Sequence, residues 1–204
     1  MNPTRRLLAS APGKLAALAT VGAVAVAISV TAATSATATS STFTFGLQAS
    51  SSAITACLPN AKGSVTITTG ALNDVMKVTI QGMPHGSDFD LFVIQQPGAP
   101  FGVSWYQTDI HAGSTGTGTA TVRGVFDSET FSVSPGGTTT FAPTHQYHLG
   151  LWFNSPQLPF NKGCEPGATQ PIVTPFNGEQ HAGIQVLNTA QFPVAAGPLS
   201  QVHR

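Results

Sequence analysis

The sequence predicts an all-β protein, a two-sheet sandwich of the immunoglobulin-like or jelly-roll-like kind. Apolar and polar residues alternate in some eight short segments, which is the period of a strand with one buried face. Turns rich in Gly and Pro separate these segments, and no capped apolar pattern of helix length follows residue 40. Short strands at this spacing favour two packed sheets over an α/β fold.

The clearest predicted element is a hairpin. Ser64–Thr68 and Val75–Ile80 alternate cleanly on either side of a turn-rich connector at 70–74. The period of two places one set of side chains inside and the other in water. The inward set is Val65, Ile67, Met76, Val78 and Ile80, and the outward set is Thr66, Thr68, Lys77 and Thr79.

Further strands are expected along the rest of the chain. Phe43, Phe45 and Leu47 also alternate, so the Ser/Thr/Ala-rich segment 39–56 is either a first strand or a loose linker before a domain at 57–204. The other predicted strands are Phe89–Ile94, Val103–Thr108, Thr117–Phe126, Thr130–Val133, Tyr147–Phe153 and Gly183–Leu187.

One segment, Ser155–Gln180, breaks the pattern of short strands. It contains five prolines and Cys164, and we expect Phe160 and Phe176 to anchor it. Irregular loops of this length in compact domains are usually functional or disordered. The cysteine favours an ordered loop, which is one candidate wall for a binding site.

The first 38 residues have the features of a cleavable secretory signal peptide. Arg5, Arg6 and Lys14 precede the uncharged apolar run Leu15–Val30, and Ala36-Thr37-Ala38 fits the A-x-A cleavage rule. The alternative is an uncleaved membrane anchor, but the run is short and Ala-rich for a membrane span. We therefore expect a protein released outside the cell, with no membrane association after cleavage.

Removing the leader changes the charge of the chain. The whole sequence has eight Lys+Arg and eight Asp+Glu, and three of the basic residues lie in the leader, so the mature chain has five against eight. A chain with this acidic balance lacks the concentrated Lys and Arg that nucleic acid requires. It also lacks a polybasic patch for anionic lipid. Nucleic acid is not an expected partner.

Two cysteines, Cys57 and Cys164, remain in the mature chain. In an exported protein, an even count without CxxC spacing predicts one disulfide bond. Free thiols or a metal pair would need a reducing compartment or additional ligands.

Four stretches resemble uncharacterised secreted proteins of actinobacteria and related bacteria. They are Asp88–Ile94, Pro100–Asp109, Gly163–Thr169 and Phe176–Gly183, and the likeness extends over most of the chain from about Cys57. The resemblance implies export and a shared fold. It assigns no activity and no functional residue.

The candidate metal ligands are two pairs, each with an ordinary alternative. His145 and His148 have HxxH spacing, which brings two rings to one face only in a helix. Asp88 and Asp90 share one face of a strand, as half of a Ca²⁺ site or as a polar edge. No third ligand lies near the histidine pair in sequence, although His85, His111 or His181 could approach it through the fold. Neither a metal nor a cofactor is expected.

Aromatic residues beside amides and carboxylates are the best candidate binding site. Aromatic faces stack on sugar rings and partner surfaces, and polar neighbours orient the ligand. We expect one of Trp105 and Tyr106 to face the core and the other to face solvent. Alternatively, Trp105 and Trp152 are both core residues. The candidate ligand-binding residues are Trp105, Tyr106, Gln107, Asp109, Trp152 and Asn154.

These observations predict a secreted, non-enzymatic module that binds a glycan or a cell-surface protein. One alternative is a hydrolase with paired carboxylates, for which Asp88/Asp90 and Asp127/Glu129 are the closely spaced pairs. The sequence contains no G-x-S-x-G elbow, P-loop or dinucleotide fingerprint. A second alternative is a structural or coat protein.

Overall fold

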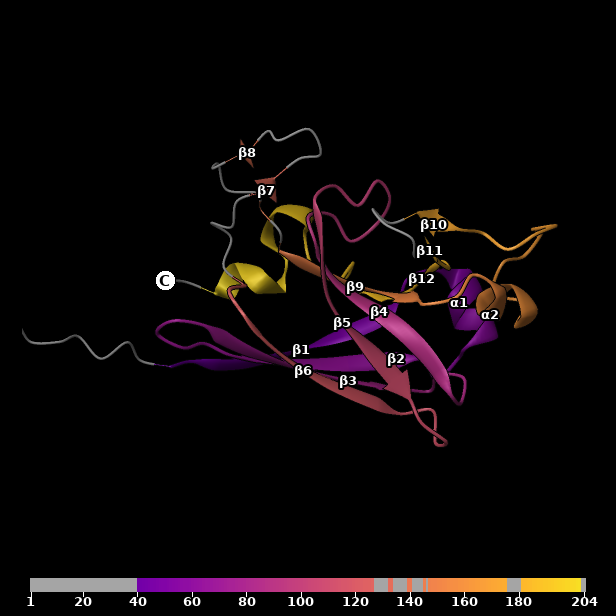
Figure 1. Cartoon of the computed structure of the whole chain (residues 1–204), viewed down its shortest axis with the longest axis horizontal. Coiled ribbons are helices and arrows are strands. Elements are labelled where there is room, and N and C mark those ends of the chain that lie inside the picture. The colour runs from indigo at the N-terminus through magenta and orange to yellow at the C-terminus, as the bar shows by residue number, and fades with distance from the viewer. Residues whose placement is uncertain are drawn as a thin grey trace, which may run out of the picture. The chain divides into compact units, whose positions relative to one another are not determined.

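The computed structural model describes residues 40–126, 132–133, 139–140, 145, 147–175 and 181–202. The described chain is mostly β. Its main feature is one antiparallel sheet of eight strands, in the order β5-β4-β9-β12-β1-β2-β3-β6, nearly closed into a barrel (Figure 1). The all-β prediction is therefore confirmed. The sheet contains β1 (Thr42–Ala49), β2 (Lys62–Thr68), β3 (Asp74–Gln81), β4 (Ser87–Ile94), β5 (Ser104–Ala112), β6 (Gly118–Gly124), β9 (His148–Phe153) and β12 (Gln185–Asn188).

The predicted hairpin is present as β2 and β3, with Val65 opposite Val78 and Ile67 opposite Met76. All five residues expected to face inward are fully buried. The alternation of small polar and branched apolar residues determines this register, because a slip by one residue would expose the whole apolar set. Segment 39–56 contributes β1, so Phe45 and Leu47 belong to the same core.

β1 joins the two halves of the sheet. Thr42–Leu47 pair with β2, and Gln48 and Ala49 pair with β12. We call β1, β2, β3 and β6 the open half, and β12, β9, β4 and β5 the covered half. A buried cluster of apolar residues from both halves fills the space between them.

β5 and β6 are the two edges of the sheet and follow each other in sequence. A tight turn joins them, in which the Gly113 N–H donates to the Thr117 carbonyl at 3.1 Å. At Gly118 the strands approach so closely that a Cβ would lie 2.4 Å from the His111 carbonyl oxygen. This contact nearly closes the barrel at one corner.

The remaining elements are short. Helices α1 (Ser52–Cys57) and α2 (Gln157–Asn161) lie at the same end of the sheet (Figure 1). Two small sheets pair β7 (Ser132–Val133) with β8 (Thr139–Thr140) and β10 (Thr174–Pro175) with β11 (His181–Ala182). Two 3₁₀ helices, η1 (Val194–Ala196) and η2 (Pro198–Gln201), follow β12.

The predicted disulfide between Cys57 and Cys164 is present, with a Cα–Cα distance of 5.1 Å. It joins the last residue of α1 to the segment that follows α2. The two cysteines are 107 residues apart in sequence, so the bond closes a long loop that includes most of the sheet.

Candidate functional site

A row of four side chains crosses the outer face of the covered half. Asp109 on β5 lies opposite Asp90 on β4, Asp90 lies opposite Trp152 on β9, and Trp152 lies opposite Gln185 on β12. Directly opposite residues on neighbouring strands share a face of the sheet. We call Asp109, Asp90, Trp152 and Gln185 the cross-strand row.

A second apolar layer covers this outer face. Phe92 and Ile94 of β4 pack with Trp152 and Ala182, and Phe101 from the β4–β5 connection packs against them. The rings of Phe101 and Trp152 are 4.8 Å apart and almost perpendicular. As a result all six residues of β9 are buried, as are all but one of the eight residues of β4.

Asp90 is the deepest polar residue of the row, with only 1% of its surface exposed. The Asn154 side-chain amide donates to Asp90 Oδ1 at 2.8 Å, whereas Asp90 Oδ2 is buried and receives no hydrogen bond from any described group. The pKa of Asp90 is raised from 3.8 to about 6, mainly because the carboxyl is buried. The hydrogen bond from Asn154 acts in the opposite direction, whereas a hydrogen bond with Asp109 and the charges of Asp109 and Asp88 contribute to the rise.

Asp109 and Tyr106 form the exposed end of the row. The Tyr106 hydroxyl donates to Asp109 Oδ1 at 2.9 Å, and the Tyr106 ring packs edge-on against Phe92 with 5.6 Å between centroids. Partial burial and the Asp109 carboxylate raise the pKa of Tyr106 to about 12. Tyr106 is therefore a neutral hydrogen-bond donor with a half-exposed ring.

A β-bulge makes the contact between Tyr106 and Asp109 possible. Thr108 lies opposite Leu91, and the next paired residue, opposite Phe92, is Tyr106. Gln107 is the extra residue, and its amide donates to the Trp105 carbonyl at 3.1 Å. In a regular strand, residues three apart point to opposite faces, so the bulge brings the two side chains to the same face.

The end of the row formed by Trp152 and Gln185 contains hydrogen-bond donors that have no acceptor among the described groups. Among the described groups, neither Trp152 Nε1 nor Gln185 Nε2 has a hydrogen-bond partner, although both atoms are buried. Both side chains lie over Gly150, where an added Cβ would be 2.4 Å from the Trp152 ring and 2.7 Å from Gln185 Nε2. Glycine at position 150 therefore provides the space that the row needs.

A second polar pair lies beside the row on the same two strands. Asp88 and His111 are opposite each other, 2.7 Å apart, and both side chains are more than half exposed. Exposed ion pairs of this kind contribute little to stability, usually below about 1 kcal/mol. The pair matters here because Asp88 adds negative charge near Asp90.

The two histidines of the HxxH motif have different environments. His145 is exposed and contacts the Tyr147 hydroxyl through Nδ1 at 2.8 Å. His148 is fully buried, with Nδ1 2.9 Å from Thr189 Oγ1 and Nε2 3.1 Å from the Val194 carbonyl. Because a carbonyl can only accept, Nε2 bears the proton. Burial lowers the pKa of His148, which favours this neutral form.

The structure describes the proline-rich loop as far as residue 175. Pro159 of α2 is buried and Phe160 is half-buried, while Phe176–Gln180 lie outside the described residues. Glu165, next to the disulfide, is buried and accepts a hydrogen bond from the Ile172 N–H at 2.9 Å. This carboxylate holds the loop in place.

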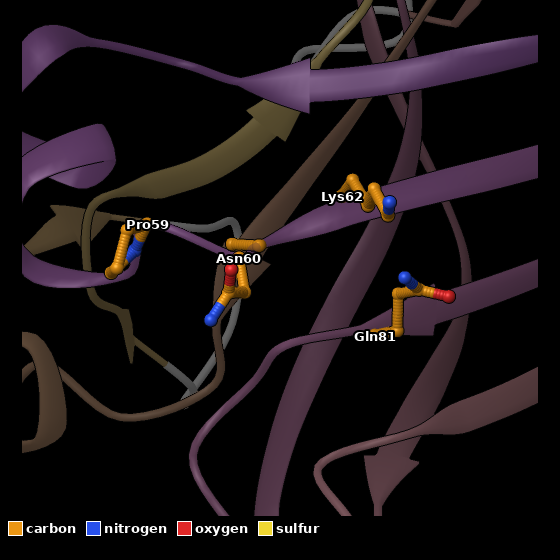
Figure 2. A pocket seen from close by; sticks show the side chains of 5 residues that line it. Pro59, Asn60, Lys62 and Gln81 are labelled. Atoms are coloured by element: carbon orange, nitrogen blue, oxygen red, sulfur yellow. The ribbon is translucent and has the colours of Figure 1, made fainter.

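A shallow hollow of about 280 Å³ lies where β2 begins and β3 ends. It is lined by Pro59, Asn60, Ala61, Lys62 and Gln81, and Figure 2 shows Lys62 and Gln81 on adjacent strands. These two residues are register partners. The lining contains no aromatic ring, carboxylate or imidazole, so the hollow offers less chemistry than the cross-strand row.

The structure brings together four of the six predicted ligand-binding residues: Tyr106, Asp109, Trp152 and Asn154 lie around Asp90. Trp105 lies opposite Val93 on the other face of β5, and Gln107 is the bulge residue. Trp105 and Tyr106 are each 49% exposed. Trp105 is on the core side of β5, since its partner Val93 belongs to the buried cluster, but neither residue is buried because β5 is an edge strand.

Sequence reasoning missed Asp90 as the centre of the site and did not consider Gln185. The alternation of Asp88, Phe89, Asp90 and Leu91 indicated only that the two aspartates share a face. Of the carboxylate pairs considered, Asp127 and Glu129 lie outside the described residues.

Within the described parts of the chain, no group of three or more His, Cys, Asp or Glu residues is placed to hold a metal ion. The same residues include no helix long and apolar enough to cross a membrane. A scan against protein-family models gives no match, and a search of curated proteins finds no significant similarity.

Proposed function

We propose that this protein is a secreted, non-enzymatic binding module that holds a glycan or another cell-surface macromolecule at the cross-strand row. The supporting observation is the convergence of Tyr106, Asp109 and Asn154 around Asp90. Tyr106 offers half of an aromatic ring to solvent, and its hydroxyl is fixed by Asp109. A ring of this kind stacks on a sugar, while fixed polar neighbours select its orientation.

Export is part of the proposal. The uncharged run Leu15–Val30 after three basic residues, with Ala36-Thr37-Ala38 behind it, supports a cleaved leader. The disulfide bond is consistent with an oxidising location outside the cell.

We also propose that the sheet is organised as a two-layer sandwich of the immunoglobulin-like or jelly-roll-like kind. The support for this is the change of partner along β1, from β2 to β12, which divides the sheet into two halves around one core.

Retention on insoluble glycans tests the proposed function. The mature protein is incubated with peptidoglycan, chitin and cellulose, and the bound fraction is compared with that of Tyr106→Ala. We expect retention on at least one glycan and a loss of about tenfold in the variant. Leu72→Ala is the control, because Leu72 is 87% exposed and lies in the β2–β3 turn. The absence of retention on all three glycans would count against the proposal.

A hydrolase is the second candidate, and the pairing of Asp90 with Asp109 favours it. Two facing carboxyls that share a proton supply an acid and a base in one place. Asp90 and Asp109 are directly opposite each other and their carboxyls are hydrogen-bonded, which is closer than the about 5 Å or more of glycosidase carboxylates, so such an enzyme would activate water between them to attack a carbonyl carbon. Hydrolysis of a peptide substrate, abolished in Asp109→Asn, would support this candidate over simple binding.

A structural or coat protein is the third class. It predicts self-association, which light scattering across a concentration series measures directly.

A further inference from the structure

We propose that Asp90 and Asp109 bind a primary ammonium group on a sugar ring, so that the ligand is a glycan containing free amino sugars. This inference rests on the proposed function and specifies its ligand. It combines three features of the outer face of β4 and β5: an unbalanced negative charge, a buried carboxylate oxygen without a partner, and a half-exposed aromatic ring.

The negative charge on this face lacks a permanent counter-charge. Asp88, Asp90 and Asp109 lie on the same face of two adjacent strands. In the described part of the chain, their only ion-pair partner is His111, which contacts Asp88 and is cationic only when protonated. Among the described residues, no lysine or arginine contributes to the raised pKa of Asp90. A cationic ligand would supply the missing charge.

The buried oxygen of Asp90 is an independent sign of a ligand. Asp90 is 1% exposed, and its Oδ2 receives no hydrogen bond from the described groups, whereas Oδ1 is bonded to Asn154. A buried carboxylate oxygen must be satisfied by a proton or by a donor. Below the pKa of Asp90 a proton between the two carboxyls does this. Above it, an ammonium group can take the proton's place.

The oxygen atoms at this place suit an ammonium group better than a metal ion. Ca²⁺ requires six to eight oxygen ligands, and the described residues contain no group of three candidate metal ligands at one place. An ammonium group has three donors and needs only about three acceptors. Asp90 and Asp109 provide carboxylate oxygens, and the half-exposed Tyr106 is held beside Asp109 by its hydroxyl.

The same geometry disfavours N-acetylated sugars. An acetamide is neutral and cannot offset the charge of two neighbouring carboxylates. It is also bulkier than an ammonium group, while Phe92 already occupies the space beside Tyr106. The site should therefore distinguish glucosamine units from N-acetylglucosamine units in chains of the same length.

Titration calorimetry with matched oligomers tests this inference at pH 7.5 and low salt. The probes are a glucosamine pentamer, an N-acetylglucosamine pentamer and a lysine pentapeptide. We expect the glucosamine pentamer to bind at least tenfold more tightly than either of the others. Asp109→Asn should remove most of this preference. Leu72→Ala is the control, since Leu72 is exposed and lies between β2 and β3, outside the acidic face, and should change affinity less than threefold.

Each other outcome has a defined meaning. Equal binding of the two sugar pentamers would refute the ammonium site and leave glycan binding standing. Equal or tighter binding of the lysine peptide would refute the amino-sugar assignment. Binding of neither sugar, together with no retention on insoluble glycans, would refute both proposals. If Asp109→Asn does not fold, Asp90→Asn is the second variant, and an unchanged preference in either folded variant would overturn the inference.

Discussion

The open and covered halves of the sheet bury their strands in different ways. In the open half the outer face is in water, and β2 and β3 alternate between buried and more accessible residues. In the covered half β4 and β9 are buried on both faces. Strands buried on one side place most of their polar side chains toward solvent, and Asp74 at the start of β3 is an exception. In the covered half, Asp90 lies in the middle of a strand and is kept from water by the layer on its outer face.

The open half uses threonine hydroxyls on its outer face. Pairs of threonines on adjacent strands have hydroxyl oxygens 3.0–3.2 Å apart. Cross-strand pairs of this kind each contribute a few tenths of a kcal/mol and carry no charge. They explain how the chain covers much of this face with few charged side chains, of which Lys77 is one. The pairs are Thr42–Thr68, Thr44–Thr66 and Thr79–Thr119.

Removing part of the aromatic layer over the covered half should have the largest effect on stability, because the open half has no such layer. Trp152 is 2% exposed and contacts both Phe92 and Phe101. Trp152→Ala should lower the free energy of unfolding by about 3–5 kcal/mol, because it leaves a large cavity. Urea denaturation measures the change. A loss below about 1 kcal/mol would mean that this layer is not packed as described.

The disulfide should have the next largest effect. Replacing Cys57 and Cys164 together by serine should lower the free energy of unfolding by about 2–4 kcal/mol, because the unfolded chain regains the freedom of a long loop. The comparison is made by thermal or urea unfolding of both proteins under oxidising conditions. Adding a reductant to the variant should change nothing, whereas it should destabilise the unmutated protein.

Asp90 should make stability depend on pH. Its folded pKa of about 6 lies above its ordinary value of 3.8, so the folded state binds more protons between these values. The contribution of Asp90 is present below about pH 4 and is lost as pH rises through 6, by roughly 2–3 kcal/mol. Asp90→Asn should remove this component, and the difference between the two unfolding curves at pH 4.5 and pH 7 measures it. A pH-independent difference would contradict the burial of this carboxyl.

The smallest effect is expected on the open face. Thr44→Ala removes one hydroxyl pair that is exposed to solvent, so the loss should be about 0.2–1 kcal/mol. The same measurement on Thr66→Ala should give a similar value, since the two residues share one hydrogen bond. A much larger loss would show that this face is covered in solution.

The alternation of apolar and polar residues predicted the open half and its hairpin, because the strands there have one face exposed to solvent. The covered half was harder to predict. Leu91–Ile94 is a continuous apolar run, which does not reveal that Phe92 and Ile94 pack outside the barrel with Trp152. The bulge at Gln107 depends on the pairing of β5 with β4, so no local pattern indicates it.

The cysteine count predicted the disulfide, since it requires only two thiols and an oxidising location. The short helices were missed because six and five residues cannot display a helical period. Around the site, the sequence predicted the exposed participants Tyr106 and Asp109. It could not predict Asp90 as their partner, because that depends on which strands become neighbours.

The turn at Gly113–Thr117 also determines how the sheet meets other molecules. Because one reversal of the chain links the two edge strands, both edges of the sheet begin beside each other at this turn. Edge strands are the usual templates for strand addition between copies. Cleaving the backbone inside this reversal would let the two edges move apart, which would make each of them easier for a strand of a neighbouring molecule to reach.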